Sequence, residues 1–276
     1  MANSSNPAFN NSPAFSSRAN IAKQLPAVPK AEMTAEQLTE LYSRPSATPT
    51  ETDRMSYQDV MFKILGSFVV LLVGAAVGWV FPVLMIPALI AGFVLALVNI
   101  FKKKPSPVLV ILYAAVEGIA VGALTMFFET MWPGIALQAV IGTFAVVGVT
   151  LALFASGKVR ASAKATKVFL IAMVGYGVFS LVNLVLVWTG AVQTPFGLNS
   201  FEIPILGGIP IGVIIGLLVV VMAAYSLVLD FDNIKTGVER GAPRIYGWAA
   251  AFGIVLTVVW LYLEILRILA LLRGSN

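Results

Sequence analysis

The sequence contains no cysteine and no histidine, and these two absences exclude much of the chemistry that proteins use. Without cysteine there are no disulfides, thiol nucleophiles or thiolate metal sites, and without histidine there is no imidazole base, ligand or pH switch. Carboxylates are therefore the remaining proton carriers near neutral pH. We expect no enzyme activity, because no pairing of a nucleophile with a base is visible, although the composition leaves a Ser/Lys or Asp/Asp pair open.

Charged residues are also scarce. They make up 11% of the 276 residues, whereas hydrophobic residues make up 59%. A soluble domain of ordinary composition carries about 25% charged residues, so the composition predicts a polytopic membrane protein. The net charge is +5, but the Lys and Arg residues are scattered among short loops. Orientation in a bilayer explains them better than nucleic-acid binding, which we do not expect.

Residues 1–58 are rich in Ser, Asn, Pro, Ala and Thr and contain few large apolar side chains. Such a segment cannot bury enough apolar surface to offset the entropy that ordering would cost. We predict a disordered polar tail here. No basic segment followed by a short apolar one marks a signal peptide, so the first apolar run is expected to remain as a spanning helix.

Residues 59–273 are predicted to form an all-α transmembrane domain of seven helices. Each apolar run is close to the roughly 20 residues that a bilayer requires. The first two runs are separated only by the turn at Phe81 and Pro82, so a reading with six spans, in which these two merge, stays open. The seven runs are approximately 62–81, 83–101, 107–128, 134–155, 168–188, 207–231 and 246–271.

Basic residues alternate between the loops, which predicts the orientation, because Lys and Arg in short loops stay on the cytoplasmic side. We expect the N-terminus in the cytoplasm and the C-terminus outside. Arg267 and Arg273 disagree with this pattern; if the last helix does not fully cross, the C-terminus lies inside. The basic residues that support the orientation are Arg54, Lys63, Lys102, Lys103, Lys104, Lys158, Arg160, Lys164, Lys167, Lys235, Arg240 and Arg244.

Glycines recur at four-residue spacing in several spans. Small residues at this spacing allow close approach of helix backbones in lipid, where no hydrophobic force drives helices together. We favour this packing interpretation over a direct role in a pore. The glycines are Gly74 and Gly78, Gly118 and Gly122, and Gly208, Gly212 and Gly216.

Three acids lie within or at the ends of the apolar runs: Glu117, Asp230 and Glu264, with Asp232 one step further into the next loop. An acid in lipid-compatible sequence is costly and usually marks an ion or proton path. At a rise of about 1.5 Å per residue, Glu117 falls near mid-membrane, Asp230 at the cytoplasmic mouth and Glu264 in the outer half. The three therefore resemble a series of steps more than one compact cluster.

Each acid also has a purely structural interpretation. Glu264 could form a salt link with Arg267, one turn along the same helix. Asp230 could cap loop structure or balance Lys235. Glu117 has no basic residue within its own span, which makes a structural explanation hardest there.

The sequences SLVLDFDNIKTGVERG and LYLEIL resemble the Bax inhibitor-1 family, also called the TMBIM or YccA/YetJ-like family, and are most similar to its bacterial Bax inhibitor-1-like branch. The resemblance covers residues from about 55 to 273. It implies seven spans with the last helix central and, through the bacterial branch, a location in a bacterial inner membrane; we expect no catalytic residues. It also implies a proton-sensitive calcium leak channel in which Asp230 and Glu264 take the places of a proton-sharing pair.

The spacing of the two acids differs from the family's. They are 34 positions apart, where roughly two dozen is usual. An antiparallel hairpin centred near Gly241 places Asp230 opposite Phe252, which leaves Asp230 and Glu264 roughly 18 Å apart along the helix axis. Glu117 is then the alternative partner. The family's basic latch residue on an earlier helix has no match here.

Two functions follow as hypotheses. The first is a pH-gated cation leak pathway for Ca²⁺ along Asp230, Glu117 and Glu264, with Asp232 and Arg267 in secondary positions, and with no cofactor beyond the transported Ca²⁺ or H⁺. The second is a non-conducting regulator that binds a membrane protease or stress-response partner through its tail. The lipid bilayer is a partner in both.

Overall fold

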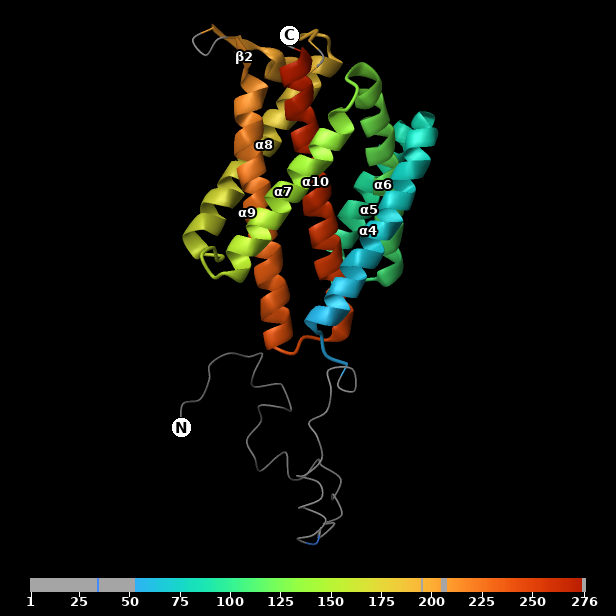
Figure 1. The fold of residues 1–276 in the computed structure, drawn as a ribbon, viewed down its shortest axis with the longest axis vertical. Helices are drawn as coiled ribbons and strands as arrows, with labels where there is room; N and C mark the ends of the chain where they lie inside the picture. Colours follow the sequence, from blue (N-terminus) through green and yellow to red (C-terminus); the bar gives the residue numbers. More distant parts are fainter. Residues whose placement is uncertain (1–33, 35–52, 195, 205–207, 275–276) are drawn as a thin grey trace, which may run out of the picture. The chain divides into compact units, whose positions relative to one another are not determined.

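The computed structural model describes residue 34 and residues 53–194, 196–204 and 208–274. Within this part of the chain, seven helices are long and apolar enough to cross a membrane (Figure 1). The protein is therefore a multi-pass membrane protein, and the predicted fold class is confirmed. The helices are α4 (Tyr57–Val80), α5 (Met85–Phe101), α6 (Pro107–Met131), α7 (Ile135–Ala155), α8 (Ala163–Trp188), α9 (Ile211–Glu239) and α10 (Gly247–Gly274).

Short elements occupy the connections between these helices. The segment between α8 and α9 holds a 3₁₀ turn and a two-stranded antiparallel hairpin in which Glu202 pairs with Pro210. The 3₁₀ turns are η1 (Pro82–Leu84), η2 (Gly197–Ser200) and η4 (Arg244–Tyr246), and the strands are β1 (Glu202–Ile203) and β2 (Ile209–Pro210).

The first two spans are separate helices. Helix α4 ends at Val80, and Phe81 leaves the helical conformation before Pro82 starts η1. Proline lacks a backbone N–H and is tolerated in the first turn of a helix, so it suits this position. The count of seven spans is thereby preferred over six.

Helix α10 is the central helix, as the resemblance implied. Its residues belong to each of the buried apolar clusters found in the described residues. Phe252 and Val255 pack with α4 and α6, whereas Leu266 and Ala270 pack with α7. Figure 1 shows α10 running through the middle of the bundle.

The glycines at four-residue spacing join α4 to α6, as predicted. A Cβ added at Gly74 or Gly78 would meet the carbonyl oxygen of Ala115 or Ile119, and one added at Gly118 or Gly122 would meet that of Leu71 or Ala75. The residue numbers of the contacting pairs increase in the same direction along both helices, so α4 and α6 run parallel. Their backbones approach as closely as glycine allows.

The last glycine series is divided between a turn and a helix. Gly208 lies between β1 and β2 with a φ of 82°, outside any helix. Gly212 and Gly216 lie in α9 and face Leu271 and Ile268 of α10. The packing prediction therefore applies to these two glycines, and Gly208 serves the turn.

Several boundaries differ from the expected ones, and among them α8 begins at Ala163 where we expected residue 168. Helix α9 begins at Ile211 and continues to Glu239, whereas we expected it to span 207–231, so Asp232 lies in the helix and not in a loop. Helix α4 begins at Tyr57, five residues earlier than residue 62. Of the predicted tail, residues 1–52 lie outside the described residues except for Thr34.

Helix α8 is peripheral. None of its residues, all of which are described, is buried. Its contacts with the rest of the bundle include Tyr225 of α9, whose ring packs on Phe169 and whose hydroxyl lies 2.9 Å from that of Thr166. Exposed apolar side chains of α8, such as Leu170 and Val174, therefore lie on the outer surface of the bundle.

Candidate functional site along the central helix

Asp230 lies inside the bundle, where α9 packs against α10. The hydroxyl of Thr257 donates a 2.8 Å hydrogen bond to Oδ2 of Asp230, and the hydroxyl of Ser226 lies 3.4 Å from that of Thr257. Gly253 leaves room for the carboxylate, since a Cβ at this position would lie 3.1 Å from Oδ1. The three polar side chains form one short chain between the two helices.

The continuation of α9 to Glu239 places Asp230 more than two turns from the end of its helix. We expected Asp230 at the mouth, but it faces residues in the second and third turns of α10. Lys235 forms an ion pair with Glu239 at 3.7 Å. No basic side chain pairs with Asp230 among the residues that the structure describes.

Glu264 is neutralised by a fixed partner. It is 4% exposed and forms an ion pair with Arg267 of the same helix. The hydroxyl of Tyr176, from α8, donates a hydrogen bond of 3.4 Å to Oε2 of Glu264. Gly216 of α9 makes room beside this carboxylate. The salt link that we considered as the structural interpretation of Glu264 is therefore present.

Asp230 and Glu264 are not brought together. Asp230 contacts Gly253 and Thr257, and Glu264 lies seven residues beyond Thr257, a rise of about 10 Å. Leu261 lies between the two levels on α10 and is 0% exposed. A layer of apolar side chains thus separates the two polar levels.

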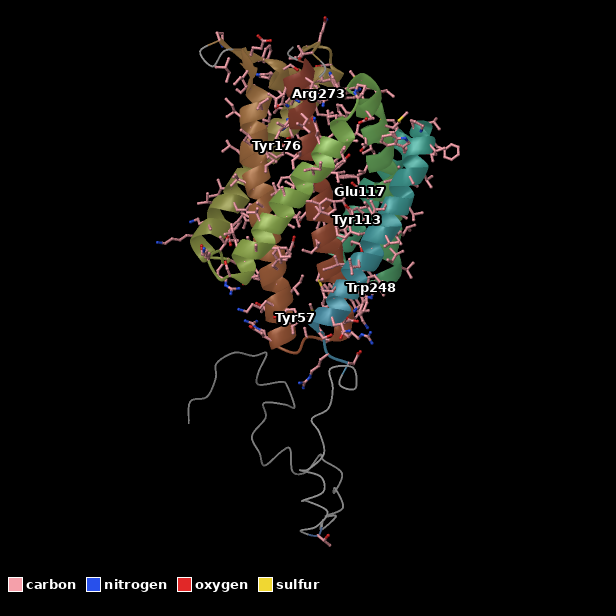
Figure 2. The ribbon with its side chains drawn as sticks, viewed as in Figure 1. Tyr57, Tyr113, Glu117, Tyr176, Trp248 and Arg273 are labelled. Atoms are coloured by element: carbon pink, nitrogen blue, oxygen red, sulfur yellow. The ribbon has the colours of Figure 1, made fainter. Side chains whose placement is uncertain are left out.

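Glu117 lies on another side of α10. Its Oε2 would be 2.6 Å from a Cβ at Gly92, so its side chain is directed toward α5. Tyr113, one turn earlier, packs its ring edgewise on Phe252 at 5.0 Å, whereas Asp230 contacts the neighbouring Gly253. Figure 2 shows Glu117 and Tyr113 on one side of α10 and Tyr176 on the other.

The surroundings of Glu117 supply no counter-ion. Within residues 53–194, 196–204 and 208–274, its carboxylate makes no ion pair and no hydrogen bond, and the buried hydroxyl of Tyr113 has no partner either. The described part of the chain also contains no group of three acidic side chains that could hold a metal ion. In the described part of the chain, the three acids therefore lie apart from one another.

Arg273, which disagreed with the charge pattern, has a structural role. Its guanidinium donates to the carbonyl oxygens of Trp132 and Pro133 at 3.3 and 2.9 Å, and to Oε1 of Gln138 at 2.9 Å. These bonds hold the last turn of α10 to the connection between α6 and α7. Together with the pair that Arg267 makes, they explain basic residues at this end of the bundle.

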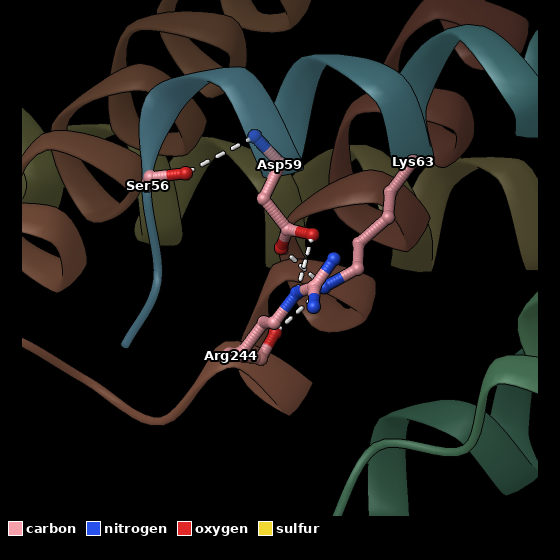
Figure 3. Close-up of polar contacts among 4 residues, drawn as sticks. All are labelled: Ser56, Asp59, Lys63 and Arg244. Carbon is pink, nitrogen blue, oxygen red and sulfur yellow. Dashed lines mark hydrogen bonds and ion pairs between the residues drawn. The ribbon is translucent and has the colours of Figure 1, made fainter. Parts of the chain in front are cut away.

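Sequence reasoning missed a group of charged residues at the opposite end of α10. Figure 3 shows Asp59 and Lys63 of α4 meeting Arg244 of η4. Asp59 accepts from Arg244 Nε at 2.8 Å and from Lys63 Nζ at 2.5 Å, and Lys63 also donates to the carbonyl oxygen of Arg244 at 2.7 Å. An acid four residues before a base in the first turn of a helix was the available signal. Thr257, Ser226 and Tyr176 were also missed.

The fold and these positions define a class: a polytopic α-helical membrane protein with a central last helix and acidic side chains within its apolar helices. The chain belongs to the Bax inhibitor-1 family, because the family model described as Bax inhibitor 1 like matches residues 6–274. The match covers essentially the whole chain and confirms the family that the resemblance indicated. A search of curated proteins gives no match.

Proposed function

We propose that this protein is a pH-sensitive leak pathway for Ca²⁺ or other cations, gated by its intramembrane carboxylates. We also propose that it lies in a bacterial inner membrane with its N-terminus in the cytoplasm. Most of the Lys and Arg residues lie in or next to the connections at the end of the bundle that holds the α9–α10 loop, which supports this orientation.

The observation that carries the proposal is the contrast between Asp230 and Glu264. Glu264 has Arg267 as a fixed counter-ion. Among the described residues, the carboxylate of Asp230 is hydrogen-bonded to the hydroxyl of Thr257 and has no basic partner. An acid inside a membrane bundle without a fixed cation is balanced either by a proton or by a mobile cation. Exchange between these two states is the chemistry of a pH-sensitive cation path.

The apolar layer between the two polar levels supports a closed state. Ala223, Leu227 and Leu261 are each 0% exposed and belong to one cluster between α9 and α10. Hydrophobic constrictions of this kind gate ion paths by excluding water. Opening would require α9 and α10 to separate at this apolar layer. A change of charge at Asp230 alters the free-energy cost of bringing water to the layer.

Calcium flux into liposomes tests this proposal. Purified protein is reconstituted with a calcium dye inside, and flux is measured between about pH 6 and pH 8, where a carboxylate in a desolvated site titrates. We expect flux that varies with pH in the wild type, and a loss of this variation in Asp230→Asn. Glu202→Gln, which alters an exposed acid in β1, is the matched control.

The outcomes separate the two candidate functions. Flux equal to that of empty liposomes for the wild type, Asp230→Asn and Glu264→Gln would overturn the leak pathway. The remaining candidate would then be a non-conducting regulator of a membrane protease or stress-response partner. That function predicts a loss of activity in cells when residues 1–52 are removed, and full activity when Asp230 is neutralised.

A further inference from the structure

Residues Asp53–Ser56, which precede α4, are fixed to the loop that joins α9 to α10. The backbone N–H of Met55 donates to the carbonyl oxygen of Ala242 at 2.7 Å, and that of Arg244 donates to the carbonyl oxygen of Asp53 at 2.9 Å. Arg54 and Pro243 form an antiparallel β-bridge. We call residues Asp53–Ser56 the strap, because they cross the connection between the two helices that carry Asp230 and Glu264.

The side chain of Met55 is buried against α9 and α10 at the end of the bundle where these helices are joined. Met55 is 4% exposed and belongs to the same apolar cluster as Leu227, Ile234 and Leu261. Its Sδ lies 3.1 Å from the place where a Cβ at Gly237 would be. Gly237 therefore provides the space that the methionine fills.

Met55 lies at the end of the helix face that carries Asp230. Asp230, Ile234 and Gly237 are at positions i, i+4 and i+7 of α9, which places them on one face. Gly237 is seven residues, or about 10 Å, closer to the loop than Asp230. Water that approaches Asp230 along this face from the loop end meets first Met55 and then Ile234, which is 9% exposed.

The charged residues at the start of α4 fasten the strap. Asp59 bonds to Arg244, and Lys63 bonds both to Asp59 and to the carbonyl oxygen of Arg244 (Figure 3). The hydroxyl of Ser56, the last strap residue, accepts a 3.2 Å bond from the backbone N–H of Asp59. The strap is thus held by its own backbone bonds and by an ionic clamp directly behind it.

We propose that the strap closes the loop-end access to Asp230, with Met55 as the plug and Asp59, Lys63 and Arg244 as the clamp. Methionine is flexible and unbranched, so it fills the space beside Gly237 and can leave it without a rearrangement of the helices. Residues 1–52 continue directly from the strap. A force or a binding event on that segment would therefore act on the plug. The consequence for flux rests on the proposed function, whereas the closure itself does not.

Thiol labelling tests the closure without any assay of transport. The natural chain has no cysteine, so Ile234→Cys introduces a single thiol directly behind the plug. Its reaction with a membrane-impermeant charged methanethiosulfonate is followed in full-length protein in liposomes. We expect Met55→Ala to speed labelling by about tenfold or more, because protection by a local closure falls as the closure weakens. Met61→Ala alters a 57% exposed methionine of α4 and should leave the rate unchanged.

A second variant replaces the plug by a covalent link between the strap and α9. Met55→Cys with Gly237→Cys, joined by a short bis-methanethiosulfonate that forms a disulfide with each thiol, fixes the strap to α9. Cross-linking should abolish calcium flux, and reduction should restore it. If Met55→Ala changes the labelling rate of the Ile234→Cys thiol by less than about twofold, the closure is overturned. If the wild type conducts and the cross-linked protein conducts equally, the strap does not gate the path. If the wild type gives no flux, the proposed function fails while labelling still decides the closure.

Discussion

Replacing Gly122 by alanine is expected to force α4 and α6 apart. The added Cβ would lie 1.9 Å from the carbonyl oxygen of Ala75 and 2.6 Å from its carbonyl carbon. Ordinary contact begins near 3.4 Å, so the backbones must separate by roughly 1.5 Å at this point. The obstacle is backbone and not a flexible side chain, so it cannot rotate away. Overpacking of this kind costs about 1–3 kcal/mol and sometimes more.

The same interface provides a ranked series. The corresponding distances are 2.0 Å for Gly78, 2.2 Å for Gly118 and 2.3 Å for Gly74. The loss of stability in alanine variants should follow this order, with Gly122 first. Two substitutions in one protein should cost less than the sum of the single costs, because the first has already separated the helices.

Thermal unfolding of the purified protein in detergent measures these effects. Gly66→Ala is the matched control, since Gly66 lies in α4, the helix that Gly122 of α6 contacts, and no described atom lies within 4 Å of its added Cβ. The control should be neutral or stabilising, because alanine is favoured over glycine in a helix by about 1 kcal/mol. If Gly122→Ala is as stable as Gly66→Ala, the close parallel packing of α4 on α6 is refuted.

Two further predictions concern the basic residues of α10. Arg267→Gln should lower the melting temperature sharply, because it leaves the buried carboxylate of Glu264 unpaired at a cost of about 3–5 kcal/mol. The double variant Arg267→Gln, Glu264→Gln should recover much of this loss. A double variant no more stable than Arg267→Gln alone would contradict the ion pair. Arg273→Met should release the last turn of α10 and increase backbone hydrogen exchange over residues 269–274, whereas unchanged exchange would show that its carbonyl bonds do not hold this turn.

The number of spans and the glycine packing could be predicted because each leaves a regular signal in the sequence. Spanning helices need long apolar runs, and close helix pairs in lipid need small residues one turn apart. The glycine rule does not name the partner helix, however. That α4 pairs with α6, and not with its neighbour in sequence, depends on contacts between distant segments.

The end of α9 could not be predicted from polarity. The segment from Asp230 to Glu239 is rich in charged and polar residues and resembles a loop, yet Ile234 and Met55 bury one face of it. Asp230 was expected opposite Phe252; it lies against the neighbouring Gly253 and, one turn further along α10, accepts a hydrogen bond from Thr257. The loop is centred on Pro243 and not on Gly241, and reflection of Asp230 through Pro243 reaches Leu256, next to the observed Thr257.

The parallel pairing of α4 with α6 has a consequence for synthesis of the protein. Helix α4 leaves the insertion machinery before α6 has been synthesised. The glycine-containing face of α4 therefore stays unpacked until α6 is complete, about fifty residues later. At about 5–20 residues per second, this wait lasts on the order of 3–10 s. During that interval α5 has to enter the membrane without coming between them. Nascent chains arrested before Met131 should therefore hold α4 in a state open to capture by other membrane proteins or by quality-control proteases.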